Sequence, residues 1–187
     1  MSQERTEAIV LRGVDFSETS RVVTFLTPDR GRFACMAKGV RRKNSPLAGA
    51  LDTLNRIELV YLWKDERSVQ TLCEASLLDG YTAIKKDLEK SVYAAFPAEI
   101  AGRVAHENEP SQELYDTLVR GMESLAAWTG SVRAHACWQV IQLLGAAGFE
   151  PMVDTCAECG RPIAGPAGFS WEVGVMCVSC RADQPLT

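Results

Sequence analysis

Five short segments in the first eighty residues restrict the fold of this chain most strongly. Each is rich in β-branched or aromatic residues, and several alternate between apolar and polar side chains. They cover residues 6–14, 21–27, 32–37, 56–63 and 69–78. Most connections between them are too short for a helix, and Pro28-Asp29-Arg30-Gly31 is typical of a tight turn. This pattern predicts a small, closed or nearly closed five-stranded barrel.

The pattern changes near Gly80, where apolar residues begin to recur at helical spacing. In the first helical segment the recurring residues are Ile84, Leu88, Val92 and Ala95, and helix-forming residues continue from 98 to 106. Pro110 and Ser111 are a favourable start for the next helix. A third segment, residues 132–144, is apolar on most sides, which predicts a buried helix.

Four of the seven cysteines form two C-x2-C pairs with seventeen residues between them: Cys156 with Cys159, and Cys177 with Cys180. This spacing is typical of a structural zinc site. Four thiolates surround zinc at ~2.3 Å and leave no open position, so the predicted metal is structural and not catalytic. Unpaired or disulfide-bonded cysteines are the alternative, which a reducing compartment disfavours.

The segment that includes the two cysteine pairs has too little apolar material for a core of its own. Phe169, Trp171 and Val173 lie between the pairs, where we expect a hairpin that brings them together. Gly160 follows the first pair and can take the left-handed conformation that a tight turn at a C-x2-C pair needs. Metal binding should therefore supply much of the folding free energy of this segment.

Composition and the first residues narrow the class of protein. The apolar content of 47% and the charged content of 24% are those of a folded globular chain. No apolar run approaches the ~18 residues of a membrane span. The charged start, MSQERTEAIVLRG, is unlike a secretory signal peptide. We therefore expect a cytoplasmic protein that does not engage a membrane.

Positive charge gathers in the first part of the chain. Residues 1–43 hold nine Lys/Arg against five Asp/Glu, whereas residues 44–187 hold eleven against nineteen. Small five-stranded barrels bind nucleic acid through basic side chains on their loops. Contacts to phosphates alone carry no sequence information. A solvated basic turn is the alternative. Four candidate DNA contacts lie on the predicted loop between the third and fourth strands: Lys38, Arg41, Arg42 and Lys43. Two more, Arg30 and Arg32, lie one strand away.

Catalytic motifs are not found in the sequence. It has no phosphate-binding glycine loop, nucleophile elbow or kinase signature. We expect Cys35, Cys73 and Cys137 to be small buried apolar residues. The two histidines are interpreted as residues on a surface or a helix face. The sequence therefore favours a protein that is not an enzyme and has no small-molecule substrate; an enzyme that uses a lone cysteine is the weakest alternative.

Three stretches, in this order, resemble the bacterial recombination-mediator family RecO. They are "AIVLRGVDFSETSRVVTFLTPDRG", "AKGVRRKNSPLAGAL" and "LLGAAGFEPMVDTCAECG" with the closing "GVMCVSC". The resemblance implies an α+β chain in three parts: an OB-fold barrel at residues 1–80, an α-helical domain at 81–153 and a four-cysteine zinc module at 154–187. It places the basic loop of the OB fold at Lys38, Arg41, Arg42 and Lys43, and the zinc ligands at the four paired cysteines.

The resemblance also implies a function in recombinational DNA repair and the DNA damage response. Such proteins bind single- and double-stranded DNA, anneal complementary strands and work with RecR. They engage the single-stranded-DNA-binding protein and help to load the RecA recombinase, which implies a nucleoid-associated, cytoplasmic protein. Members usually continue past the second cysteine pair, so we expect a fragment or a short variant. The alternative function is a zinc-containing protein-interaction adaptor in which the basic loop is incidental.

Overall fold

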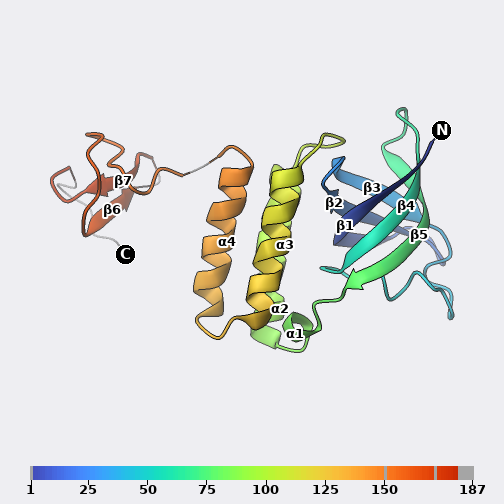
Figure 1. The fold of residues 1–187 in the computed structure, drawn as a ribbon. Coiled ribbons are helices and arrows are strands. Elements are labelled where there is room, and N and C mark those ends of the chain that lie inside the picture. Colours follow the sequence, from blue (N-terminus) through green and yellow to red (C-terminus); the bar gives the residue numbers. More distant parts are fainter. Residues whose placement is uncertain (1, 150, 171, 181–187) are drawn as a thin grey trace. The chain divides into compact units, whose positions relative to one another are not determined.

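The computed structural model describes residues 2–149, 151–170 and 172–180. Five strands, β1 (Ser2–Asp15), β2 (Arg21–Thr27), β3 (Gly31–Ala37), β4 (Arg56–Trp63) and β5 (Val69–Asp79), form a closed barrel in the order β1-β2-β3-β5-β4 (Figure 1). Strands β3 and β5 run parallel and the other neighbours run antiparallel. This is the strand order of an OB fold, so the predicted five-stranded barrel is confirmed.

The barrel closes because β1 serves two neighbours. Its first half pairs with β4 and its second half with β2, and a bulge between Val10 and Arg12 bends the strand between them. Strand β3 alternates between buried and half-buried residues, as a strand with one face on a core does. Aromatic rings fill the interior, where the centroids of Phe33 and Tyr61 are 4.8 Å apart. The barrel is therefore a packed core and not a channel.

Four helices follow the barrel: α1 (Thr82–Lys85), α2 (Leu88–Val104), α3 (Gln112–Ala127) and α4 (Val132–Ala146). The side chain of Asp87 caps α2 and that of Ser131 caps α4, each by accepting a backbone N–H of the first turn. One hydrophobic cluster joins Ile9 and Leu26 of the barrel to helical residues such as Leu118. Barrel and helices thus form one compact unit, Met1–Phe149.

Among the helices within the described ranges, none has the length and apolarity to cross a membrane.

The exposed faces of two helices differ from the prediction. The prediction that residues 132–144 are buried is wrong for one face of α4, where Trp138 is 51% exposed and Ile141 is also exposed. The reason is that α4 packs on α2 and α3 along its other face. In α2 the larger apolar side chains of Leu88 and Val92 are exposed, whereas alanines of the same helix are buried.

The prediction of three buried lone cysteines is correct only in part. Cys35 faces the barrel interior, whereas Cys73 and Cys137 are exposed. Cys73 lies in β5 and Cys137 lies on the open face of α4, so neither side chain meets a packed interior.

A second compact unit begins after Phe149. Its strands β6 (Ala167–Ser170) and β7 (Gly174–Cys177) pair antiparallel, so the hairpin predicted between the cysteine pairs is confirmed. Gly160 has φ +68, as expected for the turn after the first pair. Trp171 lies outside the described residues. The division of the chain at residues 80 and 153 stays a prediction.

Candidate nucleic-acid interface and metal centre

The basic loop, residues 38–43, begins where β3 ends. Gly39 has φ +70, and the Arg42 N–H donates to the Gly39 carbonyl oxygen over 3.1 Å, which closes a tight turn. Lys38, Arg42 and Lys43 are exposed on this turn. No side-chain hydrogen bond or ion pair joins these three to another residue in the described part of the chain. The turn therefore presents three uncommitted positive charges to solvent.

Arg41 lies in the same loop but has partners. Its Nη1 donates to the Ser17 carbonyl oxygen over 2.9 Å, and its Nε lies 3.3 Å from the Asp15 carboxylate. The Arg41 backbone N–H also donates to the Thr19 carbonyl oxygen over 3.1 Å. Asp15 is shared with Arg21, at 2.9 Å. Arg41 thus fastens the basic loop to the β1–β2 loop, residues 16–20.

The two arginines predicted one strand away also have partners. Arg30 donates to both carboxylate oxygens of Glu4, and its guanidinium lies 4.3 Å from the centroid of the Trp63 ring. Arg32 donates to the Gly102 carbonyl oxygen over 3.0 Å and lies 2.7 Å from the Glu107 carboxylate. The six predicted DNA contacts are therefore three free cations and three engaged ones, and their contact with DNA stays a prediction.

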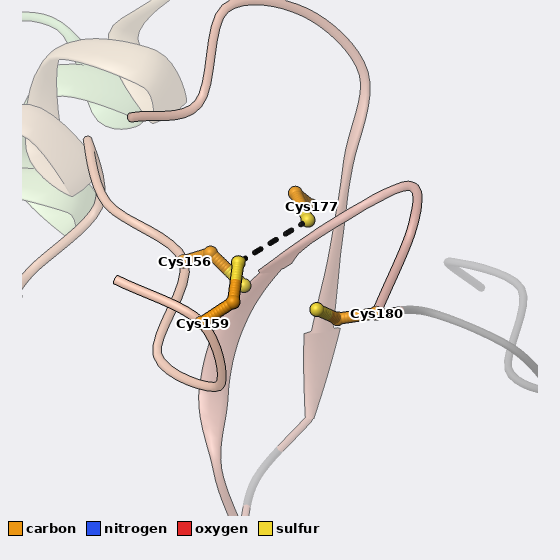
Figure 2. Close-up of side chains that lie close together, drawn as sticks. All are labelled: Cys156, Cys159, Cys177 and Cys180. Carbon is orange, nitrogen blue, oxygen red and sulfur yellow. Dashed lines mark hydrogen bonds between the residues drawn. The ribbon is translucent and has the colours of Figure 1, made fainter. Parts of the chain in front are cut away.

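The four paired cysteines converge on one point (Figure 2). Their sulfur atoms all lie within 4.8 Å of one another, and Cys159 Sγ is 3.8 Å from Cys177 Sγ. Sulfurs at ~2.3 Å from a common tetrahedral centre are ~3.8 Å apart. Donor type, donor number and spacing thus fit a single tetrahedral metal ion, and these four residues can hold one.

Two tight turns present the thiols. The Gly160 N–H donates to the Cys156 carbonyl oxygen over 2.8 Å, and the Cys180 N–H donates to the Cys177 carbonyl oxygen over 3.0 Å. The two pairs also meet through the backbone, because the Ala157 N–H donates to the Val175 carbonyl oxygen over 2.8 Å. One tight turn thus presents each pair of thiols.

Arg161 is a neighbour of the thiols that the sequence reasoning missed. Its Nε donates to Cys159 Sγ over 3.3 Å, and its Nη2 lies 4.0 Å from Cys177 Sγ. The donated hydrogen bond stabilises the thiolate and lowers the pKa of Cys159 to about 6. A cation two residues after a predicted thiolate ligand is the signal that could have found it.

A closed OB-fold barrel with a basic loop, joined to a helical bundle and a four-thiol centre, defines the class: an OB-fold protein with added helical and metal-binding parts. Comparison with protein families identifies the family. The family model described as "Recombination protein O N terminal" matches residues 1–81, and the model described as "Recombination protein O C terminal" matches residues 85–186. The chain belongs to the recombination protein O (RecO) family, which confirms the resemblance.

Individual relatives agree with this family. The chain is 31% identical to DNA repair protein RecO of Anaeromyxobacter dehalogenans over 100% of its own length and 74% of the relative. It is 34% identical to DNA repair protein RecO of Rhodopirellula baltica over 95% of its own length and 67% of that relative. It is 31% identical to DNA repair protein RecO of Desulforudis audaxviator over 99% of its own length and 73% of that relative.

Proposed function

We propose that this chain is a DNA-binding recombination mediator in recombinational DNA repair that performs no catalysis. The observation that carries this function is the set of three uncommitted cations, Lys38, Arg42 and Lys43, on one turn of the OB barrel. The formal net charge of the chain is −4, so the chain as a whole does not attract the negatively charged DNA. A local basic cluster has to supply it. Membership in the RecO family and the names of the relatives support the same function.

In this function the basic loop binds the phosphates of single- and double-stranded DNA. Neutralised phosphates repel each other less, so two complementary strands bound in this way can anneal without a catalytic step. We propose that the chain works with RecR, engages the single-stranded-DNA-binding protein and helps to load the RecA recombinase. Its location is then cytoplasmic and nucleoid-associated, and it has no small-molecule substrate. Arg41 adds to the positive charge of the loop while it keeps its protein partners. Arg30 and Arg32 lie at the other end of β3 and are paired with Glu4 and Glu107, so we propose them as secondary DNA contacts.

We propose zinc as the metal of the four-cysteine centre. Cys156, Cys159, Cys177 and Cys180 are the ligands, and the bound ion would hold their two turns together. With four protein ligands the ion has no position for a substrate. Its role is therefore to stabilise the fold of the second unit.

The second candidate function is a zinc-containing protein-interaction adaptor. The exposed apolar side chains of Trp138 and Ile141 on α4 favour it, because large apolar groups that share one surface often mark an interface. In that function the basic loop is incidental, and its cations would have no effect on the activity of the protein.

A salt titration of single-stranded DNA binding separates the two functions. In the test variant Lys38, Arg42 and Lys43 are replaced by Gln. We expect its affinity at moderate salt to fall at least tenfold. The slope of log Kobs against log salt should flatten by about 0.7 for each lost phosphate contact. The matched control replaces Lys86, Arg120 and Arg133, all exposed on the helical part, by Gln. Wild-type affinity and slope in the test variant would reject the proposed DNA site and favour the adaptor.

A further inference from the structure

An apolar strip lies on the outer face of the barrel beside the basic loop. It consists of Val14, Phe16, Val22 and Met36. In the strand register Val14 is opposite Val22, and Val22 is opposite Met36. Their neighbours Val23 and Cys35 are fully buried, so by alternation Val14, Val22 and Met36 lie on the outer face. Val14 is 46% exposed and Phe16, in the β1–β2 loop, is 69% exposed.

Cations flank the apolar strip at both of its ends. Arg12 precedes Val14 by two residues on β1 and is exposed, with no side-chain hydrogen bond or ion pair to any described residue. At the other end lies the basic loop with its three free cations. Arg41 ties this loop to the carbonyl oxygens of Ser17 and Thr19, the residues that follow Phe16. The β1–β2 loop, which includes Phe16, and the basic loop, which carries the three free cations, are thus fastened to each other.

Phe16 differs from the other aromatic residues of the barrel. The rings of Phe25, Phe33, Tyr61 and Trp63 are all buried, with at most 7% of each residue exposed. Phe16 is exposed instead, and Arg41 fastens its loop to the basic loop. Proteins that bind single strands combine these two elements: cations for the backbone and aromatic faces on which bases stack.

We propose that Phe16 and the apolar strip form a base-stacking platform for single-stranded DNA whose phosphates lie on the basic loop and on Arg12. This inference rests on the proposed function. It adds a strand preference, because the bases of a duplex are already paired and stacked on each other. Charge complementarity selects the ligand, since an apolar strip between cations suits a chain with apolar bases and an anionic backbone. Arg41 is a positioning residue, because it holds the β1–β2 loop against the basic loop.

The test compares Phe16→Ala, Phe16→Trp and wild type on oligothymidine and on a duplex of equal length, by fluorescence anisotropy. We expect Phe16→Ala to bind oligothymidine about tenfold more weakly, the loss of one stacked base. Its salt slope should not change, because no phosphate contact is lost, and duplex binding should be unaffected. Phe16→Trp should keep its affinity, and its added tryptophan emission should be quenched by oligothymidine more than that of wild type.

Phe96→Ala is the matched control, since Phe96 is 50% exposed on α2 and belongs to neither the strip nor the loop. It should bind both ligands as wild type does. Arg41→Gln should weaken oligothymidine binding, and adding Phe16→Ala should then cost less than it does alone. Fully additive losses would overturn the positioning role of Arg41.

If Phe16→Ala keeps wild-type affinity while the triple Gln variant of the basic loop loses it, the stacking platform is wrong and the DNA site stands. If the triple variant also binds normally, the DNA site itself is wrong. Equal loss on single strand and duplex would likewise overturn base stacking. Binding of an acidic peptide, oligoglutamate, as tightly as oligothymidine would overturn the assignment of the strip to DNA bases.

Discussion

At the scale of single residues, Arg161 is the side chain with the clearest effect on the four-cysteine centre. Four thiolates around Zn²⁺ carry a net charge of about −2. Arg161 Nε lies 3.3 Å from Cys159 Sγ and donates a hydrogen bond to it, so this guanidinium would offset part of the charge of the proposed zinc centre. Outer neighbours of this kind orient the ligands of a metal and tune its affinity. Arg161 is therefore expected to strengthen zinc retention without being a ligand.

Replacing Arg161 by Gln should lower zinc affinity by about tenfold, the low end of the effect of such outer neighbours. Competition with a chromogenic zinc chelator measures it. Cys156→Ser is the reference for loss of a ligand: it should lower the zinc content and unfold the second unit. Arg133→Gln, on α4, is the control and should retain zinc as wild type does. Wild-type retention in Arg161→Gln would show that the contact is incidental, and full metal content in Cys156→Ser would reject the site.

At the scale of elements, α3 and α4 meet around a buried histidine. His135 of α4 is 2% exposed, and its Nε2 is 3.1 Å from the Ser124 hydroxyl of α3. Its Nδ1 is buried and has no hydrogen-bond partner among the described residues. Burial, aided by the positive charge of Lys90, lowers the pKa of His135 below its usual value of 6.5. Folding thus favours the neutral form of this imidazole.

The stability of the helical bundle should depend on pH through His135. When the pH falls below about 6.5, the unfolded chain binds a proton at this residue more readily than the folded chain does. The free energy of unfolding therefore falls with acidification. Urea unfolding at pH 7.5 and at pH 5.5 measures the change. His135→Gln should reduce the difference between the two pH values; an unchanged difference would place the sensitivity in another group.

The same elements show what a helical pattern leaves open. The period of residues 84–95 indicates helical structure but does not reveal a break, because Ile84 lies in α1 and α2 begins at Leu88. In α2, Leu88 and Val92 are exposed, whereas alanines such as Ala94 and Ala98 are buried. Small side chains let α2 approach its neighbours closely, so the packed face is not the one with the largest apolar residues. Periodicity identifies a helix, whereas the choice of its packed face depends on helices elsewhere in the sequence.

At the scale of the whole described unit, one of the joints between the barrel and the helices is a glycine turn at the start of β3. Gly31 is buried and has φ +56. The Arg32 N–H donates to the His106 carbonyl oxygen over 3.1 Å, and the Ser111 N–H donates to the Pro28 carbonyl oxygen over 2.8 Å. A Cβ on Gly31 would lie 2.4 Å from the Glu109 carbonyl oxygen and 2.6 Å from that of His106. The joint therefore requires a residue without a side chain.

Gly31→Ala should destabilise this unit by about 2–4 kcal/mol, from the left-handed backbone and from the forced shift of two backbone carbonyls. Urea unfolding followed by circular dichroism measures the loss. Gly49→Ala is the matched control, because a Cβ there would meet no atom within 4 Å and its backbone is not left-handed. Equal unfolding midpoints for the two variants would mean that the joint tolerates a side chain at residue 31.

Several features of this protein follow from the sequence by itself. The five strands are readable because a strand with one buried face alternates its side chains within a few residues. The metal centre can be predicted from the sequence because two residues between cysteines suffice for one turn. The spacing of Cys156 and Cys159 therefore indicates metal ligands without knowledge of the rest of the fold. The positive charge of residues 38–43 and the RecO resemblance are likewise properties of contiguous stretches.

Only the tertiary structure decides which of these charges and rings are free. Arg30 is paired with Glu4 and Arg32 with Glu107, partners that no local pattern could identify. Phe16 is exposed whereas Phe25 is buried, although both occur in β-rich sequence. The physical reason is that coulombic attraction, hydrogen bonding and burial depend on distance in space, and residues far apart in the chain become neighbours only when the barrel closes and the helices pack on it.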